Sequence, residues 1–317
     1  MNRAAPPLIL APMRGLAMLA FRRAFAEPLR EAGAAAAYSP FVPAGAGGPP
    51  GRSAFADVAG PQPLPLVPQT IGKNPAAVAA VLRIFKDMGY ARADLNAGCP
   101  FPMVRKKGRG SGLLENPSLL ARICEAGVET MGPGNFSVKV RLGVADPDTL
   151  ARDVMPVLDR FPLACVAIHP RTAVQMYGGA VDMDRYFRAA RASANPVVYN
   201  GDLDCAGGAA AIAARWTALY GADSLPAAFM AGRGLVRAAG AHARAKELLL
   251  RYLEDSEREM SGPAPVMGRI KELLACWRAV PRWAACWPRA KLARTPAELR
   301  VAVASAFPAG RQPLNAG

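Results

Sequence analysis

Short runs of apolar residues alternate along the chain with longer segments whose apolar positions have a helical spacing. Eight of the short runs are nearly continuous in apolar residues, as strands buried on both faces are expected to be. They lie at residues 8–13, 34–42, 65–71, 92–98, 136–143, 165–171, 195–203 and 227–234. The pattern therefore predicts eight buried parallel strands before residue 235.

Helix boundaries are marked between several of these runs. The dipeptides at 74–75, 116–117 and 146–147 read Asn-Pro, Asn-Pro and Asp-Pro. Each supplies an N-cap side chain followed by proline in the first helical turn. Gly89 and Gly132 stand where the first two helices should end. Helices are thus expected between successive strands.

Strands alternating with helices predict an α/β fold, and eight such units predict a (β/α)8 TIM barrel. An open doubly wound sheet is the alternative, but no G-x-G-x-x-G follows a strand near the N-terminus. A glycine- and proline-rich stretch at 43–52 is expected to be a flexible loop insertion. After residue 240 the strand pattern stops, and 241–260 and 266–280 have amphipathic helical spacing. We therefore expect a barrel domain at 1–239 and a small all-helical domain at 240–317.

The positive charge of the protein suggests a binding partner. The chain carries a net charge of +15 with a pI near 10.1, and residues 269–294 hold seven basic residues and one acidic residue. A general coding bias toward arginine is one explanation, and a polyanionic partner such as nucleic acid is the other. The local concentration of charge favours the nucleic acid.

Cysteine usage and hydropathy narrow the class of protein. Six cysteines and two histidines occur without zinc-type spacing, so no metal site is expected. Prolines and an arginine interrupt the apolar start, so a secretory signal is not expected. A chain of this size without such a signal is not expected to have a disulfide framework. No apolar run reaches the ~18 residues of a membrane span. We expect a cytoplasmic protein, monomeric and without membrane attachment.

Polar or glycine-rich clusters follow nearly every predicted strand, and in a barrel these ends form the active-site face. Glycines at 201, 232 and 234 would let backbone N–H groups approach a phosphate, and Arg233 could clamp it. Lys139, one of two cations at alternate positions of the fifth strand with Arg141, would place positive charge beside an electron-accepting ring. Flavin mononucleotide (FMN) satisfies these requirements with one ligand.

The motifs APMRG at 11–15, LNAGCPFPMVRKKGRGSGLL at 95–114, VKVRLG at 138–143, IHPRTAVQMYGG at 168–179, NGDL at 200–203 and GRG at 232–234 occur in this order. With them the sequence resembles the tRNA-dihydrouridine synthase family. The resemblance implies FMN as cofactor, NADPH as electron donor and a uridine of tRNA as substrate. The segment GRIKELLACWR at 268–278 is similar to the bacterial C-type subfamily, which modifies position 16 of the D-loop.

The resemblance also implies site residues. Those implied to contact FMN are Ala11, Pro12, Met13, Gln69, Lys139, Asn200, Gly201, Asp202, Gly232 and Arg233, with His169 beside the ring. Those implied or expected to contact RNA are Asn96, Arg105, Lys106, Lys107, Arg171, Tyr177, Arg269, Lys271 and Lys291. Three features depart from the family pattern: the insertion at 43–52 is longer than expected, Ser111 replaces a small apolar residue, and the region around Cys276 lacks the particular aromatic residue that the resemblance leads us to expect.

Cys99 is the expected catalytic residue. The implied reaction saturates the C5–C6 double bond of uracil, and a proton must reach C5 from the face opposite the flavin. A thiol with a reference pKa of ~8.5 is mostly protonated at neutral pH, which suits a proton donor. Gly98 and Pro100 constrain the backbone around it. The alternative for the residue alone is a buried small hydrophobic side chain.

Two other functions remain open at this point. A flavin-barrel reductase acting on a free pyrimidine or an enone would share the barrel features but would not need a basic helical domain. A tRNA-binding protein without catalysis would not need Cys99 and Lys139. The tryptophans at 277, 283 and 287 are expected to be core residues, which leaves RNA contact to the cations around them.

Overall fold

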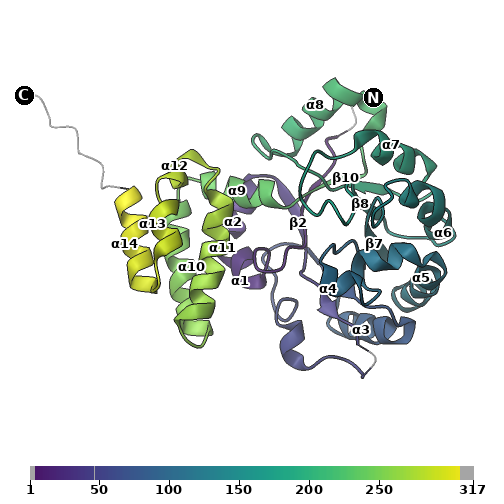
Figure 1. The fold of residues 1–317 in the computed structure, drawn as a ribbon, viewed down its shortest axis with the longest axis horizontal. Helices are drawn as coiled ribbons and strands as arrows, with labels where there is room; N and C mark the ends of the chain where they lie inside the picture. The colour runs from purple at the N-terminus through teal and green to yellow at the C-terminus, as the bar shows by residue number, and fades with distance from the viewer. Residues whose placement is uncertain (1–3, 46, 308–317) are drawn as a thin grey trace, which may run out of the picture.

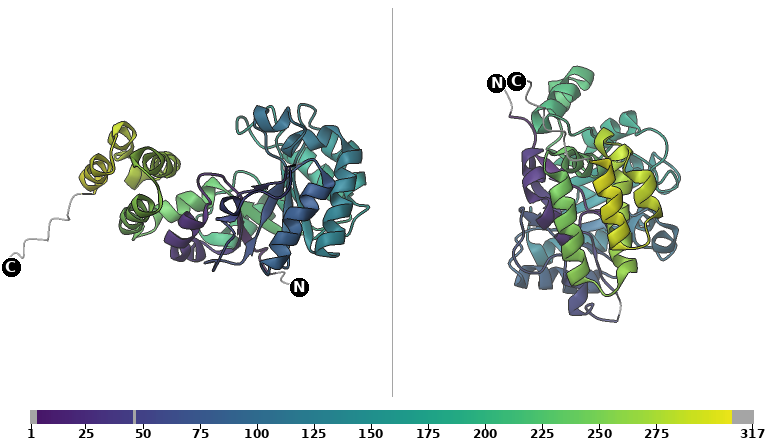
Figure 2. Two further views of the ribbon diagram at one scale, coloured as in Figure 1. Left: turned by 90° about the horizontal axis from the view of Figure 1, so that it is seen from below. Right: turned by 90° about the vertical axis from the view of Figure 1, so that its left-hand side faces the viewer.

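The computed structural model describes residues 4–45 and 47–307, and it has two lobes (Figures 1 and 2). The larger lobe contains all ten strands of the described chain, and the smaller one, green to yellow in the figures, contains only helices. Helix α9 (Arg233–Ala241) connects them, so the predicted boundary between 239 and 240 falls within this helix.

Every strand pairing in the larger lobe is parallel. The strands are β1 (Leu8–Leu10), β2 (Ala34–Tyr38), β3 (Val42–Pro43), β4 (Leu66–Val67), β5 (Gln69–Ile71), β6 (Ala93–Ala97), β7 (Phe136–Arg141), β8 (Val166–His169), β9 (Val197–Tyr199) and β10 (Ala228–Ala231). Each lies within one of the eight apolar runs or overlaps it by all but one residue. The eight predicted strands are therefore confirmed.

The ten strands close into an eight-membered barrel. The order is β3-β5-β6-β7-β8-β9-β10-β1-β2-β4. β2 and β3 are two pieces of one extended segment, and β4 and β5 are two pieces of the next. Since β2 pairs with β4 and β3 pairs with β5, these two segments run side by side and complete the ring. The (β/α)8 prediction is confirmed, and the open sheet is excluded.

Helices cover the outside of the barrel (Figure 1). They are α1 (Leu19–Ala24), α2 (Ala26–Glu31), α3 (Pro75–Asp87), α4 (Pro102–Arg105), α5 (Pro117–Met131), α6 (Met155–Leu158), α7 (Met183–Ala192), α8 (Gly208–Tyr220) and α9. Short helical turns η1 (Arg52–Phe55), η2 (Gly110–Glu115), η3 (Leu150–Val154) and η4 (Ala222–Ser224) supplement them. The predicted loop insertion at 43–52 runs from β3 to η1, with residue 46 outside the described part.

The capping signals account for two of these helices and only partly for a third. The side chains of Asn74 and Asn116 accept hydrogen bonds from backbone N–H groups three residues on, as N-caps do. Gly132 ends α5 with a φ of 91°. At 146–147, however, the Asp146 carboxylate accepts from the Asp148 N–H and forms a turn instead. The helical segment there begins later, with η3 and α6.

The smaller lobe consists of α10 (Ala245–Glu259), α11 (Pro263–Trp277), α12 (Pro281–Ala284), α13 (Trp287–Leu292) and α14 (Pro296–Ala306). Trp277 and Trp283 are buried and donate from Nε1 to the carbonyl oxygens of Val236 and Gly240 on α9, at 2.6 and 2.7 Å. A Cβ on Gly240 would lie 2.7 Å from the Trp277 ring, so only glycine permits this approach. These two tryptophans fix the lobe to the barrel, which confirms their prediction as core residues. Residues 308–317 of the predicted domain lie outside the described part.

Apolar side chains fill the layer between barrel and helices, but one layer inside the barrel is polar. Gln69, Asp94 and Ser137 are fully or almost fully buried on adjacent strands, in register with one another. This polar layer lies one step deeper in the barrel than Asn96 and Lys139, which pair with each other nearer the strand ends. Within the described residues no helix is long and apolar enough to cross a membrane.

Candidate active site at the barrel mouth

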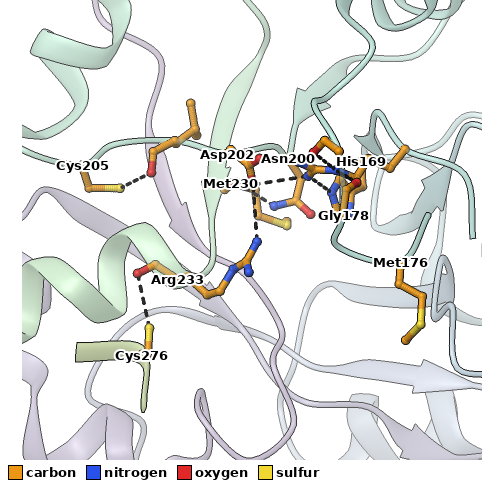
Figure 3. Close-up of polar contacts among 12 residues, drawn as sticks. His169, Met176, Gly178, Asn200, Asp202, Cys205, Met230, Arg233 and Cys276 are labelled. Carbon is orange, nitrogen blue, oxygen red and sulfur yellow. Dashed lines mark hydrogen bonds and ion pairs between the residues drawn. The ribbon is translucent and has the colours of Figure 1, made fainter. Parts of the chain in front are cut away.

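The carboxyl ends of the strands bring most of the sequence-predicted site residues to one end of the barrel. Cys99 follows β6, Lys139 lies on β7, and His169 ends β8. Asn200 and Asp202 follow β9, and Figure 3 shows both beside His169, with the side chain of Arg233 from α9 reaching toward them. Residues from at least four segments thus meet at this end, which we call the mouth.

Cys99 lies on a backbone turn held by one side chain. Asn96 Oδ1 accepts hydrogen bonds from the backbone N–H groups of Gly98 and Cys99, at 3.1 and 2.8 Å. The Cys99 carbonyl oxygen accepts from both the N–H and the hydroxyl of Ser111, at 3.1 and 2.8 Å. Ser111, which departs from the family pattern, therefore fixes the carbonyl of the catalytic candidate. The thiol is carried by backbone tied on both sides.

A close approach of glycine completes this turn. Gly110 has a φ of +56°, and a Cβ there would lie 2.8 Å from Cys99 Cβ and 2.9 Å from its carbonyl oxygen. A side chain at position 110 would displace Cys99, and an L-residue would also be strained at that φ. The glycines in GRGSG thus let the chain return against the thiol-bearing turn.

The environment of Cys99 keeps the thiol protonated. The residue is 8% exposed, and burial raises the pKa of its thiol. The backbone N–H of Phe101 and then the charges of Arg141, Lys139 and Arg14 oppose this shift by favouring the thiolate, but burial is the larger effect. A protonated thiol close to cations can donate its proton and leave a thiolate that those cations stabilise.

Lys139 and Arg141 lie on the same face of β7 and supply positive charge at the mouth. Burial, followed by repulsion from Arg141, lowers the pKa of Lys139 to about 8. Arg141 donates from Nε to the carbonyl oxygen of Gly98 at 2.9 Å, and from NH1 to those of Thr172 and Met176 at 2.9 and 2.7 Å. It thereby connects the Cys99 turn to the loop that follows β8.

That loop carries Tyr177, which lies half-exposed between two cations. The guanidinium carbons of Arg141 and Arg233 lie 5.3 and 5.5 Å from the centre of its ring, within the range of cation–π attraction. Met176, just before it, has a φ of 50°, the one positive value at a non-glycine residue of the described chain. Strained backbone of this kind persists where surrounding contacts over-determine it, and the Arg141 bond to the Met176 carbonyl is such a contact.

Arg171, which was expected to contact RNA, is buried inside the protein. It is 1% exposed, and its guanidinium binds the Asp202 carboxylate, the carbonyl oxygens of Gly178 and Gly179, and Nε2 of His169. With its donors used inside the protein, it positions Asp202 and His169. Because the Arg171 N–H donates to Nε2, the proton of the neutral imidazole lies on Nδ1.

His169 is neutral in this setting. Burial lowers the pKa of its imidazole well below the usual value, and Arg141, Lys139, Arg171 and Arg233 lower it further. Of the carboxylates near them, Asp202 is paired with Arg171 and Arg233, and Asp94 is buried. The cations at the mouth therefore outnumber the anions, and an anionic ligand would be stabilised there.

The ends of β9 and β10 fit the phosphate of such a ligand. Asn200 donates from Nδ2 to the Met230 carbonyl at 2.8 Å and holds the two strand ends together (Figure 3). A Cβ on Gly232 would lie 2.9 Å from Met13 Sδ, so the start of α9 lies close to the segment that follows β1. Helix α9 begins here at Arg233 without a side-chain cap, and the N–H groups that start a helix can bind an anion. The residues present fit FMN.

The predicted RNA-contacting cations divide into two groups. Lys106 and Lys107 are exposed next to α4, together with the exposed apolar side chains of Phe101 and Met103, on the segment that leads away from Cys99. Arg105 is half-buried there. In the helical lobe, Arg269 is bound to Ser256 and Glu259, and Lys271 Nζ donates to the Lys291 carbonyl oxygen at 2.9 Å.

Two buried residues take part in the site without having been assigned a role from the sequence. Arg141 stands out in the sequence as a charge at an alternate position of a buried strand, and Asp94 has the same signal on β6. Gln69 donates from Nε2 to Asp94 at 2.7 Å, and Asn96 donates from Nδ2 to Gln69 Oε1 at 2.8 Å. Gln69 and Asn96, expected to contact ligands, are thus also connected to each other below the mouth.

Comparison with known proteins identifies the family. The model of the dihydrouridine synthase (Dus) family matches residues 9–250, which is most of the chain and covers nearly all of the barrel. The chain belongs to the dihydrouridine synthase family. The match includes the Cys99 turn, Lys139, Arg141 and the start of α9.

Individual relatives match shorter stretches of the chain than the family model does. A probable tRNA-dihydrouridine synthase of Rhodobacter capsulatus is 34% identical over 204 residues, 63% of this chain and 61% of that protein. The tRNA-dihydrouridine(16) synthase of Cupriavidus necator is 36% identical over 141 residues, 44% of this chain and 43% of that protein. The tRNA-dihydrouridine synthase B of Proteus vulgaris is 30% identical over 135 residues, 43% and 42% respectively. The chain thus spans less than two thirds of these relatives, and names from two subfamilies match it similarly.

Proposed function

We propose that this protein is an FMN-dependent tRNA-dihydrouridine synthase that reduces the C5–C6 bond of a uridine. The observation that carries the proposal is the Cys99 thiol, held protonated on a fixed turn at the mouth of a family-matched barrel, with Lys139 and Arg141 beside it. The names of the relatives support tRNA as the substrate.

When bound, FMN supplies the electron pair that reduces the uracil double bond. Arg233 and the first turn of α9 would hold its phosphate, and Asp202 would orient Arg233 through their ion pair of 3.5 Å. Lys139 would lie beside the ring and stabilise negative charge there. The excess of positive charge at the mouth would stabilise this arrangement, because both the phosphate and the reduced ring carry negative charge.

Cys99 would donate the proton that uracil C5 needs. Its pKa, raised by burial, keeps the proton on sulfur until charge develops on the substrate. The thiolate that remains is stabilised by Arg141 and Lys139. A base in a tRNA loop leaves its stack at less cost than a paired base, so it can reach a thiol inside the mouth.

The finer assignments belong to this proposal. NADPH as reductant and position 16 of the D-loop follow from the resemblance, and the Cupriavidus necator relative carries the same position in its name. We place the reaction in the cytoplasm, where the six cysteines, none of them paired in the structure, would stay reduced. The enzyme would act as a monomer.

Reconstitution with purified components tests the proposal. The protein is incubated with FMN, NADPH and unmodified tRNA transcripts, and dihydrouridine is mapped by mass spectrometry. We expect it at position 16, and expect no product from free uridine. Dihydrouridine at another uridine would contradict the position, whereas reduction of free uridine alone would contradict tRNA as the substrate.

A further inference from the structure

The buried hydrogen bonds below the mouth form one directed chain that ends at the Cys99 turn. Asn96 Oδ1 accepts from two backbone N–H groups, and those donors cannot turn round. The amide nitrogen of Asn96 must therefore face Gln69, which has to present its oxygen at 2.8 Å. Gln69 in turn presents its nitrogen to Asp94 at 2.7 Å and needs an acceptor there.

Among the side chains in this series of hydrogen bonds, only Asp94 has a form that accepts hydrogen bonds without donating any. Its other carboxylate oxygen accepts from the Ser137 hydroxyl at 2.6 Å, so the ionised group is satisfied on both sides. If the carboxyl group were protonated toward Gln69, the Gln69 amide would have to reverse, and so would Asn96. Asn96 would then direct an N–H toward the N–H groups of Gly98 and Cys99, and the turn would lose both bonds.

We propose that Asp94 is a positioning residue for Cys99, acting through the side-chain amides of Gln69 and Asn96. The oxygen that it presents to Gln69 holds the turn that carries the thiol, and loss of that acceptor releases the turn. The hydrogen bonds from Asp94 to the Cys99 turn do not depend on which reaction the protein catalyses. Its catalytic meaning deepens the proposed function and rests on it.

The surroundings of Asp94 act on its ionisation, but a proton taken up there can lie on the oxygen that faces Ser137, so the oxygen that faces Gln69 remains an acceptor. The carboxyl group is fully buried, and burial raises its pKa to about 7. Hydrogen bonds from Ser137 and Gln69 and the charge of Lys139 on β7 oppose that shift. Tyr38 on β2 and Cys165 just before β8 also face it, and burial keeps both of them neutral by raising their pKa.

Three substitutions separate positioning from packing. D94N keeps an oxygen for Gln69 and can donate to Ser137, whose hydroxyl accepts equally well, so the chain survives without a titratable group. D94A removes the acceptor. S137A is the matched control, because it removes a bond to the same carboxylate in the same buried layer without breaking the chain.

The reactivity of Cys99 measures the state of the turn in the full-length protein. Alkylation by iodoacetamide is followed by peptide mass spectrometry, with the partly buried Cys276 as internal reference. At pH 8 we expect D94A to raise the ratio of Cys99 to Cys276 labelling about tenfold, as the loss of buried hydrogen bonds would. D94N and S137A should change it by less than about twofold.

Q69M provides the second arm, and it remains informative if D94A does not fold. It breaks the same series of hydrogen bonds one step nearer the turn, so Cys99 labelling should rise about tenfold, as in D94A. D94A or Q69M labelling no faster than S137A would overturn the inference. Labelling requires neither turnover nor bound FMN, so failure of the proposed function would leave this result intact.

Discussion

The Nε of Arg141 donates a hydrogen bond of 2.9 Å to the carbonyl oxygen of Gly98, the residue before Cys99. The same guanidinium binds the carbonyl oxygens of Thr172 and Met176 in the loop that carries Tyr177. One side chain thus connects the Cys99 turn to the loop that carries Tyr177. Its planar, fork-like arrangement of donors makes this possible, and a lysine ammonium lacks it.

Arg141→Lys should therefore lower turnover although the charge is kept. Loss of two or three charged hydrogen bonds to carbonyl groups corresponds to a fall of about 10- to 100-fold in kcat. The measurement is single-turnover dihydrouridine formation. Arg185→Lys is the control, because Arg185 forms ion pairs with Asp148 and Asp182 away from the Cys99 turn, and its replacement should cost little. Equal activity of both variants would show that the Arg141 bonds do not position the turn.

Gly110→Ala tests the close approach to Cys99. An added Cβ would lie 2.8 Å from Cys99 Cβ and 2.9 Å from its carbonyl oxygen, so the turn must shift. Gly134→Ala is matched, since Gly134 also has a positive φ, of +73°, but a Cβ there would meet no atom of the described residues within 4 Å. Both variants should lose ~1–2 kcal/mol of stability from backbone strain. Only Gly110→Ala should lose most of its activity, as measured by thermal melting alongside dihydrouridine yield.

Lys139 should impose an upper pH limit on the reaction. Its pKa, lowered to about 8 by burial, means that the ammonium is present below that pH and is lost as pH rises through it. Lys139→Arg should stay charged and retain activity above about pH 8.5, whereas Lys139→Met should lose about 10²–10³-fold at every pH. The check is kcat against pH for the three proteins. A natural enzyme with an undiminished rate at about pH 9.5 would contradict a role for the ammonium.

Lys106 and Lys107 should contribute electrostatically to tRNA binding. Both are exposed on the segment that follows Cys99. Removing both should weaken binding and lower the slope of log K against log salt concentration by about 1.4–1.8, as two lost phosphate contacts would. Lys86→Ala, at the end of α3 remote from the mouth, should leave the slope unchanged. Binding titrations at several salt concentrations decide this, and an identical slope for the double variant would place the RNA elsewhere.

The barrel could be predicted from the sequence because its strands are buried on both faces and read as apolar runs. The N-caps at Asn74 and Asn116 were equally readable, since their effect is local. The turn at Asp146 was not, because an N-cap and an Asx turn share the same residues. In the site, Cys99 and Lys139 could be placed by strand order alone. The burial of Arg171 and the chain through Asp94 depend on contacts between distant strands, which no local pattern encodes.

The central claim is that the Cys99 thiol gives its proton to the substrate. The most direct measurement compares Cys99→Ala with the natural protein for bound FMN and for dihydrouridine formed per tRNA in a single turnover. We predict unchanged FMN content and a rate lower by about 10²–10⁴-fold, the range for loss of a general acid. A Cys99→Ala protein that forms dihydrouridine at the natural rate would contradict the claim.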